Sequence, residues 1–290
     1  MGKASRSKKT AGPRAPRPAA YAARPFAGLV GESDWVALSE ILPAATATVA
    51  LREDVGAADG PREVTICTVL PMAWPALRRA DGAVLVATQG GSRSGDASRD
   101  LGAAILAALD AEPGTPLVRV PMATDETPSL QQLLAPSAPR VTVHEGFDFW
   151  VEGQELDSTA EESLTRANDS VLPTEAVPGR ESAYWCLIGD RPHLRVVLAE
   201  DEDEATNALA RLWAAGTAAL DEGSRLLGAF RAGGLLIPVW ELAPGTGAGD
   251  LPSVVGAWRD RYAAARSDAP LTPEERRAKA GLLNRQITLR

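Results

Sequence analysis

The chain is poor in the residues that build metal centres and disulfide frameworks. Its 290 residues include two cysteines and two histidines. Cys67 and Cys186 lie far apart, each inside an apolar run, so we expect two small buried side chains rather than the disulfide framework of a secreted domain. Their spacing to His144 and His193 assembles no zinc motif. We therefore predict no metal site and no cofactor.

Long apolar runs are also missing. No segment reaches the roughly 18 apolar residues that indicate a membrane-spanning helix. The basic N-terminus is not followed by the apolar region of a signal peptide, because the short run 19–23 is closed by Arg24 and Pro25. The sequence therefore predicts no membrane insertion and a cytoplasmic location.

Acidic residues are absent from the first 24 positions, although the rest of the chain is acidic. Since the net charge of the whole chain is −8 and these positions contribute +7, residues 25–290 carry −15. The seven basic residues are Lys3, Arg6, Lys8, Lys9, Arg14, Arg17 and Arg24. This separation of charge indicates that the N-terminal segment binds an anionic partner and that the acidic body does not.

Residues 1–25 contain four prolines and no hydrophobic period, so we predict a disordered basic arm. Arms of this kind bind RNA, DNA or the ribosome through phosphate contacts. The candidate nucleic-acid-binding residues are Lys3, Arg6, Lys8, Lys9, Arg14 and Arg17. Two other interpretations stay open: a solubility tail, or an arm that folds back on its own acidic body.

The body has enough apolar material, 45% of residues, to bury a substantial core. Hydrophobic periodicity predicts an α+β fold of two related halves, each built as strand–strand–helix. In the first half we expect helices near 33–42, 101–109 and 130–134, the last opened by a capping box of Ser129 and Gln132. The expected strands are 46–51, 64–70, 83–88, 117–120, 141–144 and 147–151.

The second half repeats this order. A capping box of Thr159 and Glu162 opens a helix to about residue 167, and strands are expected at 184–188 and 194–198. The clearest helix of the chain follows at 205–213, with Leu209 and Leu212 on one apolar face that should pack on a sheet. A strand at 234–242 contains Pro238, which indicates an edge or a bulge, and a helix spans 251–262.

The two halves align around similar short patterns. Cys67 corresponds to Cys186, and Pro-x-Leu-Arg occurs at 75–78 and at 192–195. We hypothesise a diverged internal duplication. The predicted organisation is the arm at 1–25, a first half at 26–155, a second half at 156–268, and a C-terminal helix and tail at 269–290.

The C-terminal helix begins with Thr272-Pro273-Glu274-Glu275, a capping box with proline at the first helical position. Late in this helix or beyond it lie four apolar residues that could pack against another surface: Leu282, Leu283, Ile287 and Leu289. A protein partner is one candidate for that contact.

Three segments suggest chemistry, and each has a plainer interpretation. Loop 89–96, rich in Gly and Ser, lies between a strand and a helix, where phosphates bind, but it lacks the Walker A and dinucleotide patterns. His144 lies beside Glu145 and near Asp148, as a general base would, yet the same residues suit a hairpin tip. The acidic run 200–204 is best explained as a solvated helix cap rather than a cation site.

Several segments, among them 23–29, 32–38, 43–49 and 236–242, resemble an uncharacterised actinobacterial family of unknown function. Its members are sometimes labelled preprotein translocase SecA or topoisomerase II. The residues support neither label, because this sequence has no Walker A loop and no cysteine cluster. The resemblance implies no activity and no catalytic residue.

The sequence thus favours a non-enzymatic accessory protein that binds nucleic acid, the ribosome or a protein partner. The alternative is a small-molecule-binding protein or hydrolytic enzyme with its site in the cleft between the halves, where His144 or loop 89–96 would contribute. A cleft of that kind should gather polar residues from both halves.

Overall fold

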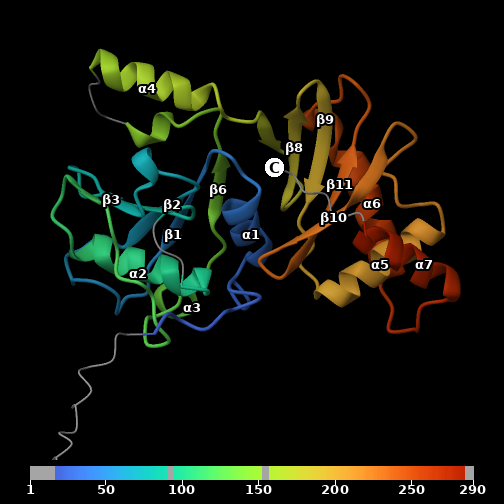
Figure 1. The fold of residues 1–290 in the computed structure, drawn as a ribbon, viewed down its shortest axis with the longest axis horizontal. Coiled ribbons are helices and arrows are strands. Elements are labelled where there is room, and N and C mark those ends of the chain that lie inside the picture. The colour runs from blue at the N-terminus through green and yellow to red at the C-terminus, as the bar shows by residue number, and fades with distance from the viewer. Residues whose placement is uncertain (1–16, 91–93, 152–156, 285–290) are drawn as a thin grey trace, which may run out of the picture.

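The computed structural model describes residues 17–90, 94–151 and 157–284 (Figure 1). Most of the predicted arm, and the extreme C-terminus with Ile287 and Leu289, lie outside these ranges. Within them the chain forms a mixed α+β fold with seven α-helices and two separate sheets. The predicted fold class is confirmed.

The first sheet has six strands in the order β5-β3-β4-β2-β1-β6. Neighbouring strands are antiparallel except β2 and β4, which run parallel. The strands are β1 (Ala45–Ala50), β2 (Glu63–Cys67), β3 (Ala76–Arg78), β4 (Val84–Ala87), β5 (Thr115–Leu117) and β6 (Arg140–Val143).

The second sheet has five antiparallel strands in the order β10-β11-β9-β8-β7. They are β7 (Thr174–Ala176), β8 (Ala183–Ile188), β9 (Arg191–Val196), β10 (Arg225–Ala232) and β11 (Leu235–Glu241). The helices are α1 (Glu32–Glu40), α2 (Ala97–Asp110), α3 (Leu130–Leu133), α4 (Ser158–Asn168), α5 (Glu202–Ala214), α6 (Pro252–Ala265) and α7 (Pro273–Asn284).

Helix α1 lies between the two sheets and joins them into one core (Figure 1). Its residues Trp35 and Val36 are fully buried, and the same cluster holds Leu235 and Ile237 of β11. Ser182, immediately before β8, donates a hydrogen bond to the carboxylate of Asp34 (2.6 Å), and its hydroxyl oxygen lies 2.8 Å from Ser33 Oγ, both on α1. The halves are therefore packed against each other through an apolar centre with a polar rim.

A second core fills the space between the second sheet and helices α5 and α6. Leu209 and Leu212 of α5 are buried in it, as their helical spacing predicts. Trp240 and Trp258 meet there edge to face, with ring centroids 4.8 Å apart.

Two of the three predicted capping boxes form at helix starts, whereas α4 begins at Ser158 and places Thr159 inside its first turn. The backbone N–H of Thr272 donates to Glu275 (2.8 Å), and the N–H of Glu275 donates to Thr272 Oγ1 (3.2 Å), which completes the predicted capping box. The box of Ser129 and Gln132 opens α3 in the same way. Each satisfies backbone donors that the first turn of a helix leaves unpaired.

Several strand predictions need correction. Segment 147–151 is not a strand but contains the 3₁₀ turn η2 (Asp148–Trp150), because Phe147 and Trp150 stack ring to ring at 4.4 Å across one turn. Strands β3, β7 and β10 were not predicted at all. Pro238 lies in an interior strand rather than at an edge, although the expected irregularity exists as a bulge in neighbouring β10 at Leu226/Gly228.

Pro238 fits in β11 because the ladder with β9 covers only Val239–Glu241. Its missing N–H falls outside that ladder, while its other side faces Ala229 of β10.

The structure does not confirm the internal duplication. Strands β8 and β9, which carry Cys186 and the second Pro-x-Leu-Arg, pair directly. Strands β2 and β3, which carry Cys67 and most of the first one, are separated by β4, and β4 is parallel to β2. The proposed domain boundaries stay predictions.

Candidate functional site

The N-terminal segment is attached to the body from Ala19 onward. Ala19 is buried and its N–H donates to Ala123 O (2.9 Å), while the N–H of Ala22 donates to Gly95 O (3.0 Å). A Cβ on Gly95 would lie 3.3 Å from both Ala19 O and Tyr21 Cα, and Gly95 has φ +140°. Glycine at this position allows the segment to lie directly on the loop before α2.

Five of the six candidate nucleic-acid-binding residues, Lys3, Arg6, Lys8, Lys9 and Arg14, lie outside the described residues. The sixth, Arg17, is exposed at the point where the described chain begins. The structure therefore fixes where the basic segment leaves the body.

Arg24, the seventh basic residue of the N-terminal stretch, has a structural role. Its guanidinium forms bonds of 2.5 and 2.9 Å with Glu32 and one of 3.0 Å to Ala199 O of the second half. The hydrogen bond to Glu32 is the main cause that raises the pKa of Arg24. This arginine ties the end of the N-terminal segment to both halves.

Between the halves lies an open groove of about 400 Å³, within the range of small-molecule sites. The segment Tyr21–Pro25 forms one wall. Polar side chains reach it from both halves: Glu40 and Asp100 from the first, Glu202 and Arg231 from the second. We call this feature the inter-half groove.

The charges of the inter-half groove have partners within the chain. Arg231 pairs with Glu202 at the start of α5. Both carboxylate oxygens of Asp100 accept the N–H of Ser94, at 3.1 and 3.0 Å. The charged side chains that line the groove are thus mainly acidic, and they lie among small and apolar residues.

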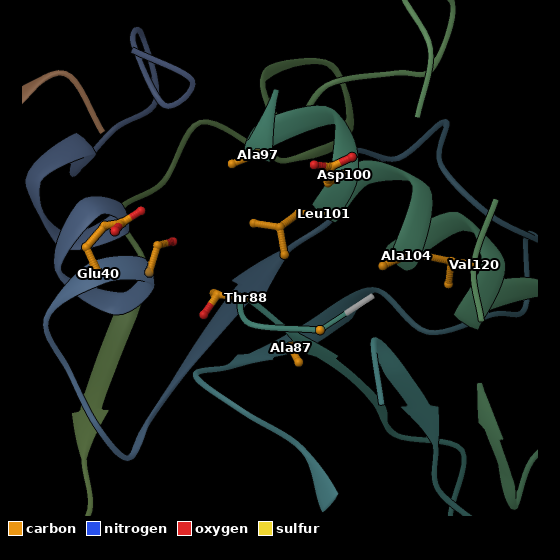
Figure 2. Close-up of a pocket in the computed structure, with 10 residues that line it drawn as sticks. Glu40, Ala87, Thr88, Ala97, Asp100, Leu101, Ala104 and Val120 are labelled. Carbon is orange, nitrogen blue, oxygen red and sulfur yellow. The ribbon is translucent and has the colours of Figure 1, made fainter. Parts of the chain in front are cut away.

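A smaller pocket adjoins the groove and shares Glu40, Ala97 and Asp100 with it. Figure 2 shows this pocket between the ends of α1 and β4 and the first turns of α2, with Leu101 pointing into it. Its volume of about 40 Å³ holds a few water molecules and is too small for a metabolite.

Loop 89–96 ends at the start of α2, but the helix-start donors are already used. Asp96 accepts the backbone N–H groups of Ser98 (3.0 Å) and Arg99 (3.3 Å). An anion at this helix end would have to compete with that carboxylate. Residues 91–93 of the loop lie outside the described ranges.

The two histidines are both placed by hydrogen bonds. His144 Nε2 lies 2.8 Å from Thr46 Oγ1, and its ring lies 4.9 Å from that of Phe149. Asp148 accepts a bond from Asn168 (3.3 Å). His193 is buried, with Nδ1 2.9 Å from Arg191 O. His144 is not among the residues that line the inter-half groove.

The two cysteines are free and buried, as predicted. Burial raises the pKa of Cys67 to about 12 and also raises that of Cys186. Both are therefore protonated thiols at neutral pH, and thiols are poor nucleophiles.

The acidic run 200–204 forms the start of α5, as predicted. Asp201 accepts the N–H of Asp203 (2.9 Å), while Glu200 and Glu204 both pair with Arg266. In the described ranges, no cluster of three or more His, Cys, Asp or Glu side chains is arranged to hold a metal ion.

The C-terminal helix packs on its own chain. Leu282 is buried in the second core, and Lys279 donates to Asp203 (3.0 Å) and Asn207 (2.9 Å) of α5. The apolar face predicted to dock is therefore occupied within the protein as far as Leu282.

One exposed side chain near the arm was not singled out by the sequence. Tyr21 is 82% exposed, although Ala19, two residues earlier, is buried. The sequence signal was an aromatic residue in a stretch otherwise made of small, basic and proline residues.

The sequence matches a family of unknown function, DUF5926, over residues 25–290. The chain belongs to this family. No curated protein and no solved structure matches it.

The DUF5926 match confirms the resemblance to an uncharacterised family across nearly the whole chain. It begins at residue 25, so the six candidate arm residues and Tyr21 precede the matched region. Among the helices described in this DUF5926 protein, none is both long and apolar enough to cross a membrane.

Proposed function

We propose that this protein is a cytoplasmic accessory protein that binds nucleic acid through the phosphate contacts of Lys3, Arg6, Lys8, Lys9, Arg14 and Arg17. The observation that carries the proposal is charge segregation. These six cations fall within 17 residues that contain no acid, and the chain from residue 25 onward carries −15. A run of cations attracts phosphates, whereas the acidic body repels them and limits contact to the arm.

The body supports this division because many of its arginines bind its own backbone. Arg78 donates to the carbonyls of Leu109 and Ala111 at the end of α2, both at 2.7 Å. Arg211 likewise donates to carbonyls at and after the end of α6, and Arg261 donates to carbonyls of the loop after α5. Guanidinium groups held in this way serve the fold and are not free to follow a phosphate backbone.

The test uses the full chain with all six arm residues replaced by Gln. Binding of a fluorescent single-stranded RNA is measured by anisotropy between 50 and 200 mM salt. With up to six phosphate contacts, the wild-type slope of log K against log salt should be about −4 or shallower. The neutral arm should remove both the binding and the slope.

A matched control replaces Arg140, Arg191 and Arg225 by Gln, because these exposed arginines lie on the body. The control should bind as wild type does. Equal binding by the arm variant and wild type, or no binding by wild type at low salt, would refute the proposal.

A second candidate function comes from the inter-half groove, which gathers polar residues from both halves, as the small-molecule alternative requires. Its test is a thermal-shift screen with a panel of polar metabolites, repeated on an Arg231→Ala variant. A ligand that raises the melting temperature of wild type, but not of the variant, would favour this function. A screen without such a ligand would count against it.

A further inference from the structure

Tyr21 is the one highly exposed aromatic residue in the described part of the chain. Its side chain is 82% exposed, whereas the other exposed large apolar side chains there are aliphatic or methionine. Aromatic rings are usually placed in cores or against partners, because each buries a large apolar area. This ring lies four residues after Arg17, the last of the six candidate nucleic-acid-binding residues.

The backbone under Tyr21 is held on both sides. The N–H of Ala20 donates to Asp125 Oδ1 (2.9 Å), and the N–H of Ala22 donates to Gly95 O (3.0 Å). The ring therefore projects from a fixed point of the body at the foot of the arm. A ring on a fixed backbone loses little conformational freedom when a second flat group stacks on it.

We infer that Tyr21 stacks on an unpaired base, and that the ligand of the arm is single-stranded rather than double-stranded nucleic acid. This inference rests on the proposed function of the arm. Proteins that bind single strands combine a positive segment along the backbone with aromatic rings under the bases. Arg17 and Tyr21 place one element of each kind within four residues of chain.

A duplex does not satisfy this geometry. Its bases are already stacked on one another, so a ring at the surface has no open base face to cover. The arm alone would bind duplex phosphates as well as single-strand phosphates. Tyr21 is thus the residue that gives the arm a preference for single strands.

The acids beside Tyr21 fix which part of the ligand lies over the groove. Glu202 is paired with Arg231, and Asp100 accepts the N–H of Ser94. An acidic wall with internal partners tolerates an uncharged base and disfavours a phosphate. The base therefore lies on the Tyr21 side, and the phosphates follow the arm.

The experiment compares wild type, Tyr21→Ala and Tyr21→Phe in the full chain, with oligo(dT) and with a duplex of the same length. Loss of one stacked base should weaken oligo(dT) binding about tenfold in Tyr21→Ala. The phenylalanine variant should bind as wild type, because it keeps the ring. Duplex binding and the salt slope for oligo(dT) should stay unchanged in both variants, because stacking releases no counterions.

A control variant, Met72→Ala, removes another highly exposed apolar side chain in a loop of the first sheet and should leave all affinities unchanged. Photocrosslinking with bromodeoxyuridine oligonucleotides, followed by mass spectrometry, should locate the crosslink at Tyr21. Wild-type affinity of Tyr21→Ala for oligo(dT), or an equal loss on duplex, would overturn the inference. The variant with six Gln substitutions in the arm distinguishes the two failures. If this variant still binds oligo(dT), the arm proposal fails. If it does not bind while Tyr21→Ala binds normally, only the role of Tyr21 is wrong.

Discussion

The hydroxyl of Ser182 donates a 2.6 Å hydrogen bond to the carboxylate of Asp34, and these two residues belong to different halves of the protein. The Ser182 oxygen also lies 2.8 Å from Ser33 Oγ, whose hydroxyl it can accept, and Ser182 adopts φ 49°, a left-handed conformation that is unfavourable for a residue with a side chain. The contact keeps serine at a position where glycine would be less strained. It is the polar counterpart of the apolar packing around α1.

Ser182→Ala should therefore destabilise the protein by about 1–3 kcal/mol, because it leaves a partly buried carboxylate without its donor. Urea unfolding followed by tryptophan fluorescence measures the change. Ser39→Ala, which removes a hydroxyl without a hydrogen-bond partner among the described residues, serves as the control and should cost less. Equal stability of wild type and Ser182→Ala would contradict the role of this bond.

At neutral pH, Asp34→Asn should stabilise the folded protein, whereas Ser182→Ala should destabilise it. Burial raises the pKa of Asp34 above 3.8, so the charged form is disfavoured in the folded state. As pH falls from neutral towards 3.8, the folded protein takes up this proton before the unfolded chain does, and the penalty disappears. The variant should thus be more stable than wild type at pH 7, by a margin that shrinks on acidification. A margin that grows towards pH 4 would show that the carboxylate stabilises the fold.

Leu209→Ala should cost about 2–5 kcal/mol, because Leu209 is fully buried between α5 and the second sheet. Calorimetry would show a lower melting temperature. A matched substitution at exposed Val118 should change it little. An unchanged melting temperature in Leu209→Ala would mean that the site is not packed as described.

The position of an N-terminal deletion should decide its effect on stability. Deleting residues 1–16 removes none of the bonds described above, so the melting temperature should not change. Deleting residues 1–24 also removes the buried Ala19 and the bonds of Arg24 to Glu32 and Ala199. That longer deletion should lower the melting temperature, and identical melting of the two truncations would disprove the anchoring role of residues 19–24.

Both thiols should be inert until the protein unfolds. Cys67 and Cys186 are buried, and burial raises the pKa of Cys67 to about 12. A colorimetric thiol reagent should react with neither cysteine in native buffer and with both in denaturant. Reductant should leave the melting temperature unchanged. A mapped Cys67–Cys186 bond in the native protein would overturn this prediction.

Much of the fold follows from local patterns. The capping box at Thr272 and the apolar face containing Leu209 depend on residues three or four apart, and both appear in the structure as predicted. The strand prediction for 147–151 was wrong, because the alternating pattern of this segment competes with stacking of Phe147 on Trp150. Trp150 also packs against a small core that only the folded first sheet creates.

The candidate site was less accessible to sequence reasoning. Charge count identifies the arm, but Arg24 belongs to the same run and is held by Glu32 and Ala199, a contact across 175 positions. The inter-half groove depends on how two halves meet, which no local pattern encodes. Strand β10 escaped detection for a related reason, because its bulge at Leu226/Gly228 breaks the alternation.

The position of α1 between the sheets also determines how late in synthesis its core can be completed. Trp35 and Val36 belong to the same core as Leu235 and Ile237, which are synthesised about two hundred residues later. Until then the nascent first half carries an uncovered apolar helix face, and contacts of such long sequence separation form slowly. A chaperone that shields Trp35 during translation would therefore increase the yield of native protein without touching the finished fold.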